Sequence, residues 1–561
     1  KIQTIDGSTV TVDFSKFPAG DWNTAITTNP DQNGNTSSWG IAGNMWAPDI
    51  IYNPVMKKWC MYLSLNGNVW NSVIVLLTAD TIEGPYVYEA PIIYSGFTSS
   101  GVTDYKKTDL GLVLNNGRTL SSLPDRYNNL ITGVDANGTA TSSNHGSYGT
   151  YWPHAIDPCV FYDDDNNLWM GYGSWSGGIY IIQLDEETGL RDYTVKYNYE
   201  ANGTPLSEGT KNANVTSDPY FGKKIAGGYY VSGEGSYIEK IGNYYYLFMS
   251  YGFYSPTGGY NMRIFRSSSP DGPYVDLNNA NAIYTSGSDN FRRTSKGLQL
   301  MGNYQWNTMS VAEIAQGHNS AFVDTDGNAY VVYHTKFSDG TAGHQLRVHQ
   351  LYQNQDGWIV AAAYEYAGET VNDENIKNIE IPAADLTGDW ELIVHQYNNT
   401  NAIDDGTITD NVIIATPKDI TLNPDGSITG AYTGTWSEKA GTAYATIIID
   451  GTEYKGVFTE QTIDGTNMKT MCFSAVNSSG VCIWGSKALS DNLIVAYNAK
   501  NEENKLPAKT KGNLTLSTNA EFGAEVTWSS SNQNIISNSG IVTLPSKDTE
   551  ITLTKTIRKG K

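Results

Sequence analysis

The sequence predicts an all-β protein whose largest part is a β-propeller. One short hairpin module recurs four times within the first 360 residues, and radial β architectures produce such repeats. The 561 residues include 56 Gly and 38 Tyr, while stretches of Leu, Ala, Lys and Glu at helical spacing are few. That composition favours many tight turns between aromatic-rich strands.

Each copy of the module opens with a polar residue that would be unusual on a buried strand. An apolar run, a turn and a second run rich in Tyr, Trp, Val and Met follow it, which is typical of a hairpin. Because the innermost strands of a propeller line its central channel, these polar side chains are expected to meet at one mouth. The copies are WAPDIIYNPVMKKWCMYLS with Asp49, AIDPCVFYDDDNNLWMGYGS with Asp157, GEGSYIEKIGNYYYLFMSYG with Glu234 and GHNSAFVDTDGNAYVVYHT with His318.

The chain divides into four regions by pattern. The propeller is expected over 1–375, and a second β domain, a barrel or sandwich of strands joined by Gly and Asn turns, over 385–490. A polar, Pro-containing linker is expected over 491–512. The tail, 513–561, resembles a bacterial immunoglobulin-like module that stops short of the roughly seven strands of a complete sandwich.

Charge and hydropathy restrict the class of partner. The 36 basic and 58 acidic side chains give a formal charge of −22, which repels nucleic acid and anionic lipid, although the same acidity also keeps a chain soluble. No apolar run approaches the roughly 18 residues that a membrane span needs. The chain begins at Lys1 without a leader-like segment, so either a leader was cleaved or the front is absent. We favour the second explanation.

The four cysteines do not have the spacing of a zinc site. Cys60 and Cys159 lie in strand runs and are expected to be small buried hydrophobes. Cys472 and Cys482 flank one hairpin turn, so they form either a cross-strand disulfide or two packed thiols.

Three of the four recurring polar residues are carboxylic acids, and a pair of carboxylic acids at one channel mouth suits glycoside hydrolysis. Two carboxyl groups at one channel mouth have different proton affinities, so one can protonate a departing oxygen while another acts as a carboxylate. Glu234 lies in a glycine-rich GEGSY context that lets a substrate approach the backbone, and Asp157 precedes Pro158. Trp46, Trp152 and Trp175 lie nearby and either cover sugar faces or pack in the core.

An insertion over 97–151 separates the first two modules and leads directly into YWPHAIDP. Long loops in compact folds are usually functional or disordered. We expect this insertion to form part of the rim of the site.

The motifs WAPD, HAIDPCVFYD, SWSGG, GEGSYIEK and GHNSAF resemble the family 43 glycoside hydrolases, in particular the longer endo-α-1,5-L-arabinanases with a C-terminal β domain. The resemblance implies a five-bladed propeller and inverting hydrolysis of arabinan, a pectin side chain. It implies that Glu234 is the general acid, that Asp157 orients the acid and tunes its pKa, and that His318 helps to hold a calcium ion largely through waters. The segments that match substrate contacts are His154, Ala155, Ile156, Asp157, Ser174, Trp175 and Ser176.

One part of the family pattern has no match in this sequence. The family's general base is an aspartate on the inner strand of the first blade, before the WAPD strand, and nothing in KIQTIDGSTVTVDFSKFPAGDW matches it. We therefore expect the first blade to be incomplete, the base to lie upstream of Lys1 and the chain to be truncated at both ends.

Alternatives remain on the same scaffold. An exo-acting α-L-arabinofuranosidase or β-xylosidase would share the fold, since fold alone does not choose the substrate. A carbohydrate-binding propeller without catalysis is the alternative from another class. The resemblance further implies a bacterial extracellular or cell-surface protein, monomeric when complete, with a polysaccharide partner.

Overall fold

The structure is a computed structural model of the chain. The residues it describes are the short strands at 2–3, 9–10 and 12–13, together with 45–66, 72–97, 108–113, 152–197, 217–231, 233–285, 294–341, 343–399, 412–501 and 506–560.

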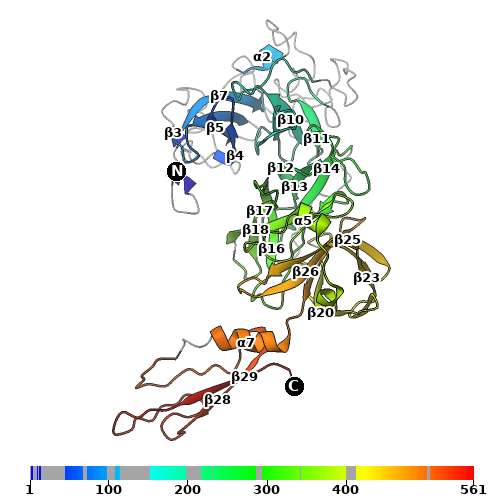
Figure 1. Cartoon of the computed structure of the whole chain (residues 1–561). Helices are drawn as coiled ribbons and strands as arrows, with labels where there is room; N and C mark the ends of the chain where they lie inside the picture. Colours follow the sequence, from blue (N-terminus) through cyan, green and yellow to red (C-terminus); the bar gives the residue numbers. More distant parts are fainter. Residues whose placement is uncertain are drawn as a thin grey trace.

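Four β-sheets are arranged as propeller blades in the described part of the chain (Figure 1). The first strands of neighbouring sheets contact one another, so they are the inner strands. The first sheet contains β4 (Met45–Asn53), β5 (Lys58–Asn66), β6 (Ser72–Ala79) and β7 (Tyr86–Ser95), with β3 (Val12–Asp13) added in parallel to β7. Strands β1 (Ile2–Gln3) and β2 (Thr9–Val10) pair separately.

The other three blades are four-stranded and antiparallel, each in chain order from the inner strand outward. The second contains β8 (Cys159–Tyr162), β9 (Leu168–Tyr172), β10 (Ile179–Leu184) and β11 (Lys223–Ala226). The third contains β12 (Glu234–Ile241), β13 (Tyr244–Tyr251), β14 (Asn261–Ser267) and β15 (Leu298–Gln299). The fourth contains β16 (Glu313–Val323), β17 (Ala329–Phe337), β18 (His344–Gln353) and β19 (Ile359–Ala361).

The predicted all-β propeller is confirmed, and each repeated module forms the first hairpin of one blade. Two of the hairpin turns have the same local cause. In each, an aspartate accepts hydrogen bonds from backbone N–H groups two and four residues on, which closes the turn: Asp163 bonds Asp165 and Asn167, and Asp324 bonds Asp326 and Asn328. A fifth blade and its general base fall outside the described residues and stay predictions.

A closed eight-stranded barrel follows the fourth blade and shares a core with it. The strands are β20 (Gly388–Val394), β21 (Lys418–Leu422), β22 (Ser427–Gly430), β23 (Gly434–Glu438), β24 (Tyr444–Ile449), β25 (Thr452–Thr462), β26 (Lys469–Asn477) and β27 (Cys482–Lys487). Short helices α5 (Asp373–Asn378) and α6 (Ala383–Leu386) lead into it. One hydrophobic cluster runs from Phe248 in the propeller to Trp484 in the barrel, so the two pack as one body.

The hypothesis of a disulfide across the β26–β27 hairpin is wrong. The register pairs Cys472 with Ser486 and Cys482 with Val476, so the two cysteines are not opposite each other. All four cysteines are free and buried.

The C-terminal segment forms a small sheet beyond the barrel (Figure 1). The region expected to be a linker contains helix α7 (Asp491–Asn501), and Asn498 exchanges hydrogen bonds with the backbone of Glu521. Helix α7 is thereby attached to η5 (Glu521–Gly523) and to the hairpin of β28 (Glu525–Ser530) and β29 (Leu553–Arg558). None of the described helices is long and apolar enough to cross a membrane.

Candidate active site

Backbone bulges lie at three of the four recurring polar residues, Asp49, Glu234 and His318. The inner-strand pairing shifts register between Trp46 and Asp49, between Glu234 and Tyr237, and between Gly317 and Ser320. Each bulge contains a residue with left-handed backbone: Ala47 (φ 37°), Gly235 (φ 56°) and His318 (φ 47°). Such bulges re-aim side chains near functional sites, and non-glycine residues adopt this conformation only when the surroundings impose it.

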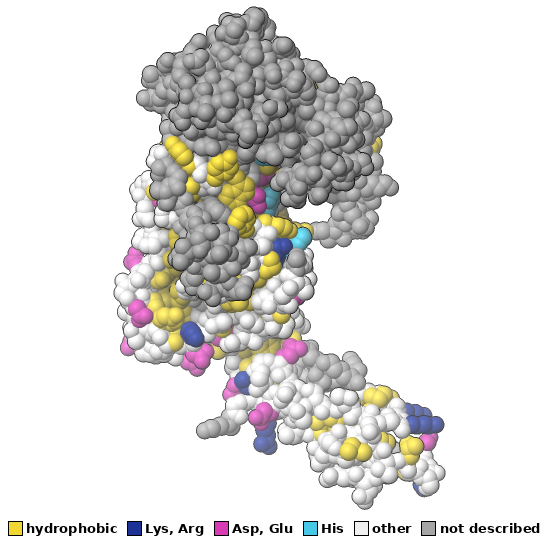
Figure 2. Space-filling model, turned by 180° about the vertical axis from the view of Figure 1, so that it is seen from behind, with side chains coloured by type: hydrophobic (Ala, Val, Ile, Leu, Met, Phe, Trp, Pro, Cys, Tyr) yellow, Lys and Arg dark blue, Asp and Glu magenta, His cyan; other side chains and the backbone are white. Residues whose placement is uncertain are grey.

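A cavity of about 210 Å³ lies where the inner strands meet. Its walls come from β4, β12, β16, β17 and β18 and from the residues just before β8. Figure 2 shows acidic and histidine side chains close together on one face, beside hydrophobic side chains. The polar residues lining the cavity are Asp49, Asp157, Ser236, Tyr237, His318, Asn319, Ser320, Tyr333 and His334.

Glu234 is held by two hydrogen-bond donors, one on each carboxyl oxygen. The Tyr260 hydroxyl donates to Oε1 at 2.6 Å, and the indole Nε1 of Trp175 donates to Oε2 at 2.9 Å. Burial, and next the negative charge of Asp157, raise the pKa of Glu234 above its usual value, while the two donors oppose that rise. The balance favours a carboxyl group that stays protonated at higher pH than an exposed glutamate.

Asp157 lies beside Glu234 and is bonded to the same strand. Its Oδ2 accepts a hydrogen bond from the backbone N–H of Gly235 at 3.1 Å, and its own N–H donates to Ser64 Oγ at 3.1 Å. The residue is only 6% exposed and has φ 53°. The structure therefore brings together the two carboxylic acids that the sequence predicted to share a site.

Most of the other predicted substrate-contact residues are buried. His154 bonds Ser72 Oγ through Nε2 at 2.8 Å, and burial lowers the pKa of its imidazole to about 3, so the ring is neutral. Ala155, Ile156, Ser174 and Ser176 are each at most 5% exposed. Their roles in binding substrate stay predictions.

The three tryptophans near the motifs differ in position. Trp175 is half-buried and bonds Glu234. Trp152 is 1% exposed and packs against Phe221, with ring centroids 5.2 Å apart, so it is a core residue and not a sugar platform. Trp46 is partly exposed on the inner strand β4.

Asp49 has a structural role at the centre of the propeller. Its Oδ2 accepts a hydrogen bond from Val160 N–H at 2.7 Å, which ties the first blade to the second, and its Oδ1 accepts from Ile50 N–H. Burial raises the pKa of Asp49 to about 7.

His318 lies at the channel among polar atoms that lack partners. Its backbone N–H donates to Ser250 Oγ at 2.7 Å. The side-chain amide of Asn319 and the hydroxyl of Ser236 are buried against the same cavity and have no hydrogen-bond partner among the described residues. No group of three or more His, Cys, Asp or Glu residues in the described ranges is placed to hold a metal directly. The unpaired oxygens of Asn319 and Ser236 fit the water shell of a hard cation, whereas the two imidazoles of the cavity, His318 and His334, are poor direct ligands for one.

Tyr260 is the site residue that sequence reasoning missed. It precedes β14, outside the repeated module, and a tyrosine in a loop of a Tyr-rich chain carries no distinctive signal. Only the folded arrangement brings its hydroxyl to Glu234.

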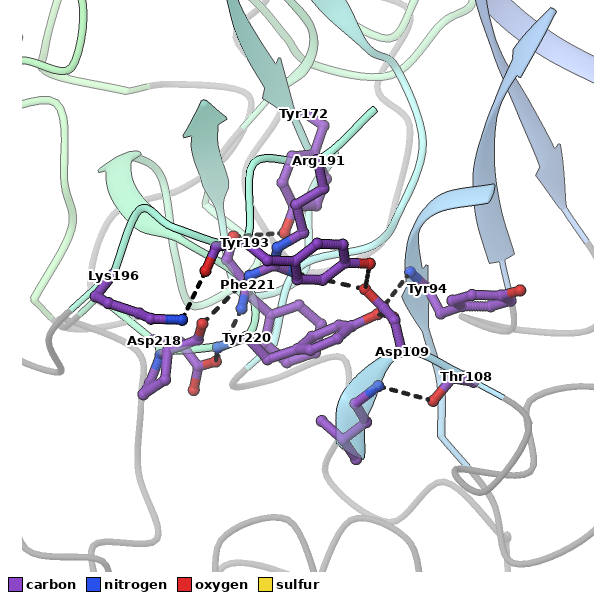
Figure 3. Close-up of polar contacts among 12 residues, drawn as sticks. Tyr94, Thr108, Asp109, Tyr172, Arg191, Tyr193, Lys196, Asp218, Tyr220 and Phe221 are labelled. Atoms are coloured by element: carbon purple, nitrogen blue, oxygen red, sulfur yellow. Dashed lines mark hydrogen bonds and ion pairs between the residues drawn. The ribbon is translucent and has the colours of Figure 1, made fainter. Parts of the chain in front are cut away.

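A buried polar cluster anchors the start of the insertion between the first two blades (Figure 3). Asp109, just before α2 (Leu110–Val113), accepts hydrogen bonds from the hydroxyls of Tyr220 at 2.5 Å and Tyr193 at 2.8 Å, and its Oδ2 lies 3.9 Å from Arg191 Nη1. The Tyr220 hydroxyl also accepts from Tyr94 N–H. Most of the insertion lies outside the described residues, so its place at the rim stays a prediction.

The class of protein that this propeller and its adjacent pair of carboxylic acids fit best is a glycoside hydrolase. Comparison with known proteins identifies the family: residues 124–359 match the model for glycosyl hydrolases family 43, 363–485 match its C-terminal lipocalin-like domain, and 487–561 match an atrophied bacterial Ig domain. The chain belongs to glycosyl hydrolases family 43, which confirms the resemblance seen in the motifs.

Similar proteins are known from several bacteria. The chain is 32% identical over 464 residues to extracellular endo-α-(1→5)-L-arabinanase 2 of Bacillus subtilis, covering 81% of each chain. It is 33% identical over 465 residues to extracellular endo-α-(1→5)-L-arabinanase of Thermotoga petrophila, covering 80% of this chain and 81% of the relative. A crystal structure of a family 43 glycoside hydrolase from Bacillus licheniformis matches with TM-score 0.59 and 32% identity, covering 80% of this chain and 84% of the other.

Proposed function

We propose that this protein hydrolyses α-1,5-L-arabinofuranosidic bonds in arabinan, in endo fashion and with inversion. The observation that carries the proposal is Glu234, a buried carboxyl held by Tyr260 and Trp175 beside the carboxyl of Asp157. The two relatives that are about a third identical to this chain are named endo-arabinanases. A relative named as an exo-acting arabinofuranosidase, from Cellvibrio japonicus, is 24% identical, which favours the endo reading.

Glu234 is proposed as the general acid. The raised pKa of Glu234 favours the protonated carboxyl, which gives its proton to the glycosidic oxygen as the C–O bond breaks. The charge of Asp157 favours the protonated form of Glu234, and its bond to Gly235 N–H fixes the strand that carries the acid. The general base is proposed to lie outside the described residues.

A calcium ion near His318 is proposed as a structural component of the site. His318, Asn319 and Ser236 would face its hydration shell. A bound cation there would offset the negative charge of the carboxyl groups and order water in the channel.

A secreted location and a polysaccharide partner are proposed together. Both endo-acting relatives are named extracellular, and arabinan lies outside the cell. We propose a monomer, with no nucleic-acid partner, in keeping with the formal charge of −22.

The test is product release from debranched arabinan by the full-length protein and by Glu234→Gln. Sodium azide is included in parallel, because an anionic nucleophile needs no base to deprotonate it and can replace base-activated water. We expect Glu234→Gln to lower turnover by about 10² to 10⁴-fold in either condition while oligosaccharide binding persists. Glu239→Gln is the matched control, because Glu239 lies on the same strand outside the bonds to the acid.

The products distinguish the alternatives. Endo action gives a ladder of oligosaccharides, and exo action gives arabinose alone. NMR of the first product shows whether the anomeric configuration is inverted. Binding without release in both conditions would favour a carbohydrate-binding propeller and overturn the proposal.

A further inference from the structure

Tyr260 lies directly behind the carboxyl of Glu234. It is fully buried, and its hydroxyl makes the shorter of the two bonds to that carboxyl, 2.6 Å against 2.9 Å from Trp175. A carboxyl group has about four lone-pair positions on its two oxygens. One donor on each oxygen therefore fixes the orientation of the group and leaves a position on each oxygen for the proton that is transferred.

The Tyr260 ring is itself held on several sides. It stacks on His334 with an interplanar angle of 11° and centroids 5.7 Å apart, and Tyr254 meets it edge-on at 5.8 Å. A Cβ atom on Gly317 would lie 2.3 Å from the ring, so the inner strand of the fourth blade packs closely against it. Asn399, beyond β20, donates to the Tyr260 carbonyl at 3.1 Å. The hydroxyl consequently has little freedom to leave Glu234.

The other donor to the Glu234 carboxyl is Trp175, whose backbone is also held in place. Trp175 has φ 46°, and its backbone N–H donates to the Gly233 carbonyl at 2.9 Å, next to the acid itself. Two residues from different blades therefore each donate a hydrogen bond to a different oxygen of the same carboxyl group. The sequence predicted this role for neither residue.

We propose that Tyr260 is a positioning residue, which together with Trp175 holds the Glu234 carboxyl in the orientation that protonates the departing sugar oxygen. The inference rests on the proposed function, since it needs Glu234 to act as the acid. A misplacement of about 1 Å in such a group costs about 10²-fold in rate. The effect should appear only when the leaving group needs a proton.

The experiment measures hydrolysis of two substrates that differ in their leaving group. Wild type and Tyr260→Phe are compared, both as the full-length protein and both in the presence of azide. Arabinan has a sugar leaving group that must be protonated, while a 2,4-dinitrophenyl arabino-oligosaccharide releases a phenolate that needs no proton. We expect kcat on arabinan to fall about 10 to 10²-fold with KM changed little. On the dinitrophenyl substrate we expect kcat to stay within about 3-fold of the wild type.

Tyr254→Phe is the matched control, because Tyr254 touches the Tyr260 ring but makes no bond to Glu234. It should behave as the wild type on both substrates. Trp175→Phe removes the other donor and should reproduce the leaving-group dependence, which keeps the inference testable if Tyr260→Phe folds poorly by circular dichroism.

Four outcomes overturn the inference. Equal loss on both substrates would mean that Tyr260 only maintains the pocket, and no loss on either would mean that Glu234 needs no support. If Glu234→Gln is inactive while Tyr260→Phe is normal, the inference alone fails. If the wild type cleaves neither substrate, the proposed function fails and the inference falls with it.

Discussion

At the residue scale, two residues of the site have left-handed backbone. His318 and Asp157 both have positive φ although neither is glycine, a conformation that costs about 1 to 3 kcal/mol per residue. Surrounding contacts must offset that cost. For His318 they include the bond to Ser250 and the packing of its ring near Gly235, where a Cβ atom would lie 3.0 Å from the imidazole.

If calcium binds near His318, chelation should lower the melting temperature. A ligand at 100 times its Kd stabilises the native state by about 2.7 kcal/mol, and that contribution is lost when the ion is removed. Differential scanning calorimetry with and without EDTA measures the loss, and His318→Ala should reduce it. His344→Ala is the matched control, because His344 is an exposed histidine at the start of β18. A melting temperature indifferent to EDTA and to added calcium would count against the ion.

At the element scale, sequence pattern predicted the hairpins well. Each repeated module became the inner hairpin of a blade because alternating apolar residues and Asx turns are local signals, as at Asp163 and Asp324. The bonds of Glu234 to Tyr260 and Trp175 could not be predicted, because they join separate blades through side chains with no local pattern. The segment expected to be a linker contains helix α7 for a similar reason: Asn498 bonds a turn 23 residues away.

The buried polar cluster around Asp109 joins the start of the insertion to the first two blades, and Asp109→Asn should weaken this cluster. The Arg191 side chain is 3% exposed and would keep a buried charge after its carboxylate neighbour is neutralised. Breaking such a buried pair costs about 3 kcal/mol. Urea unfolding followed by tryptophan fluorescence should show the first transition at lower denaturant.

Asp192→Asn is the matched control for the cluster around Asp109. Asp192 is next to Arg191 in the sequence, but its side chain accepts a hydrogen bond from Thr194 N–H in an exposed turn. An unchanged first transition for Asp109→Asn would mean that the tyrosine hydroxyls alone hold the segment.

At the scale of the whole molecule, the propeller and barrel meet at a buried acidic cluster. Arg347 on β18 binds Glu313 of β16 at 2.6 Å and Glu365 at 2.8 Å. Asp464, in the turn between β25 and β26, accepts a hydrogen bond from the backbone N–H of Glu365 at 2.9 Å. Tyr304 and Tyr333 pack around the cluster and carry no charge at neutral pH. Two carboxyl groups therefore pair with one guanidinium, and the carboxyl of Asp464 lies beside them without an ion pair of its own to Arg347.

Ionisation of these carboxyl groups should make the propeller–barrel junction less stable as pH rises. Burial raises the pKa of Glu365 to about 7 and of Asp464 to about 8, although Arg347 opposes both shifts, and burial also raises the pKa of Glu313. A carboxyl whose pKa is raised on folding stabilises the native state fully below its unfolded pKa of about 4 and loses that contribution as pH rises through the folded value. The melting temperature of the propeller–barrel body should therefore fall between about pH 5 and pH 9.

Asp464→Asn tests this dependence, because the amide oxygen can still accept from Glu365 N–H but cannot ionise. Its melting temperature should fall less between pH 5 and pH 9 than that of the wild type. Asp425→Asn, at an exposed turn between β21 and β22, is the matched control and should follow the wild type. If the melting temperature of Asp464→Asn falls with pH as steeply as that of the wild type, the ionisation of Asp464 does not destabilise the junction. The loss of stability at high pH must then come from charges elsewhere on this acidic chain.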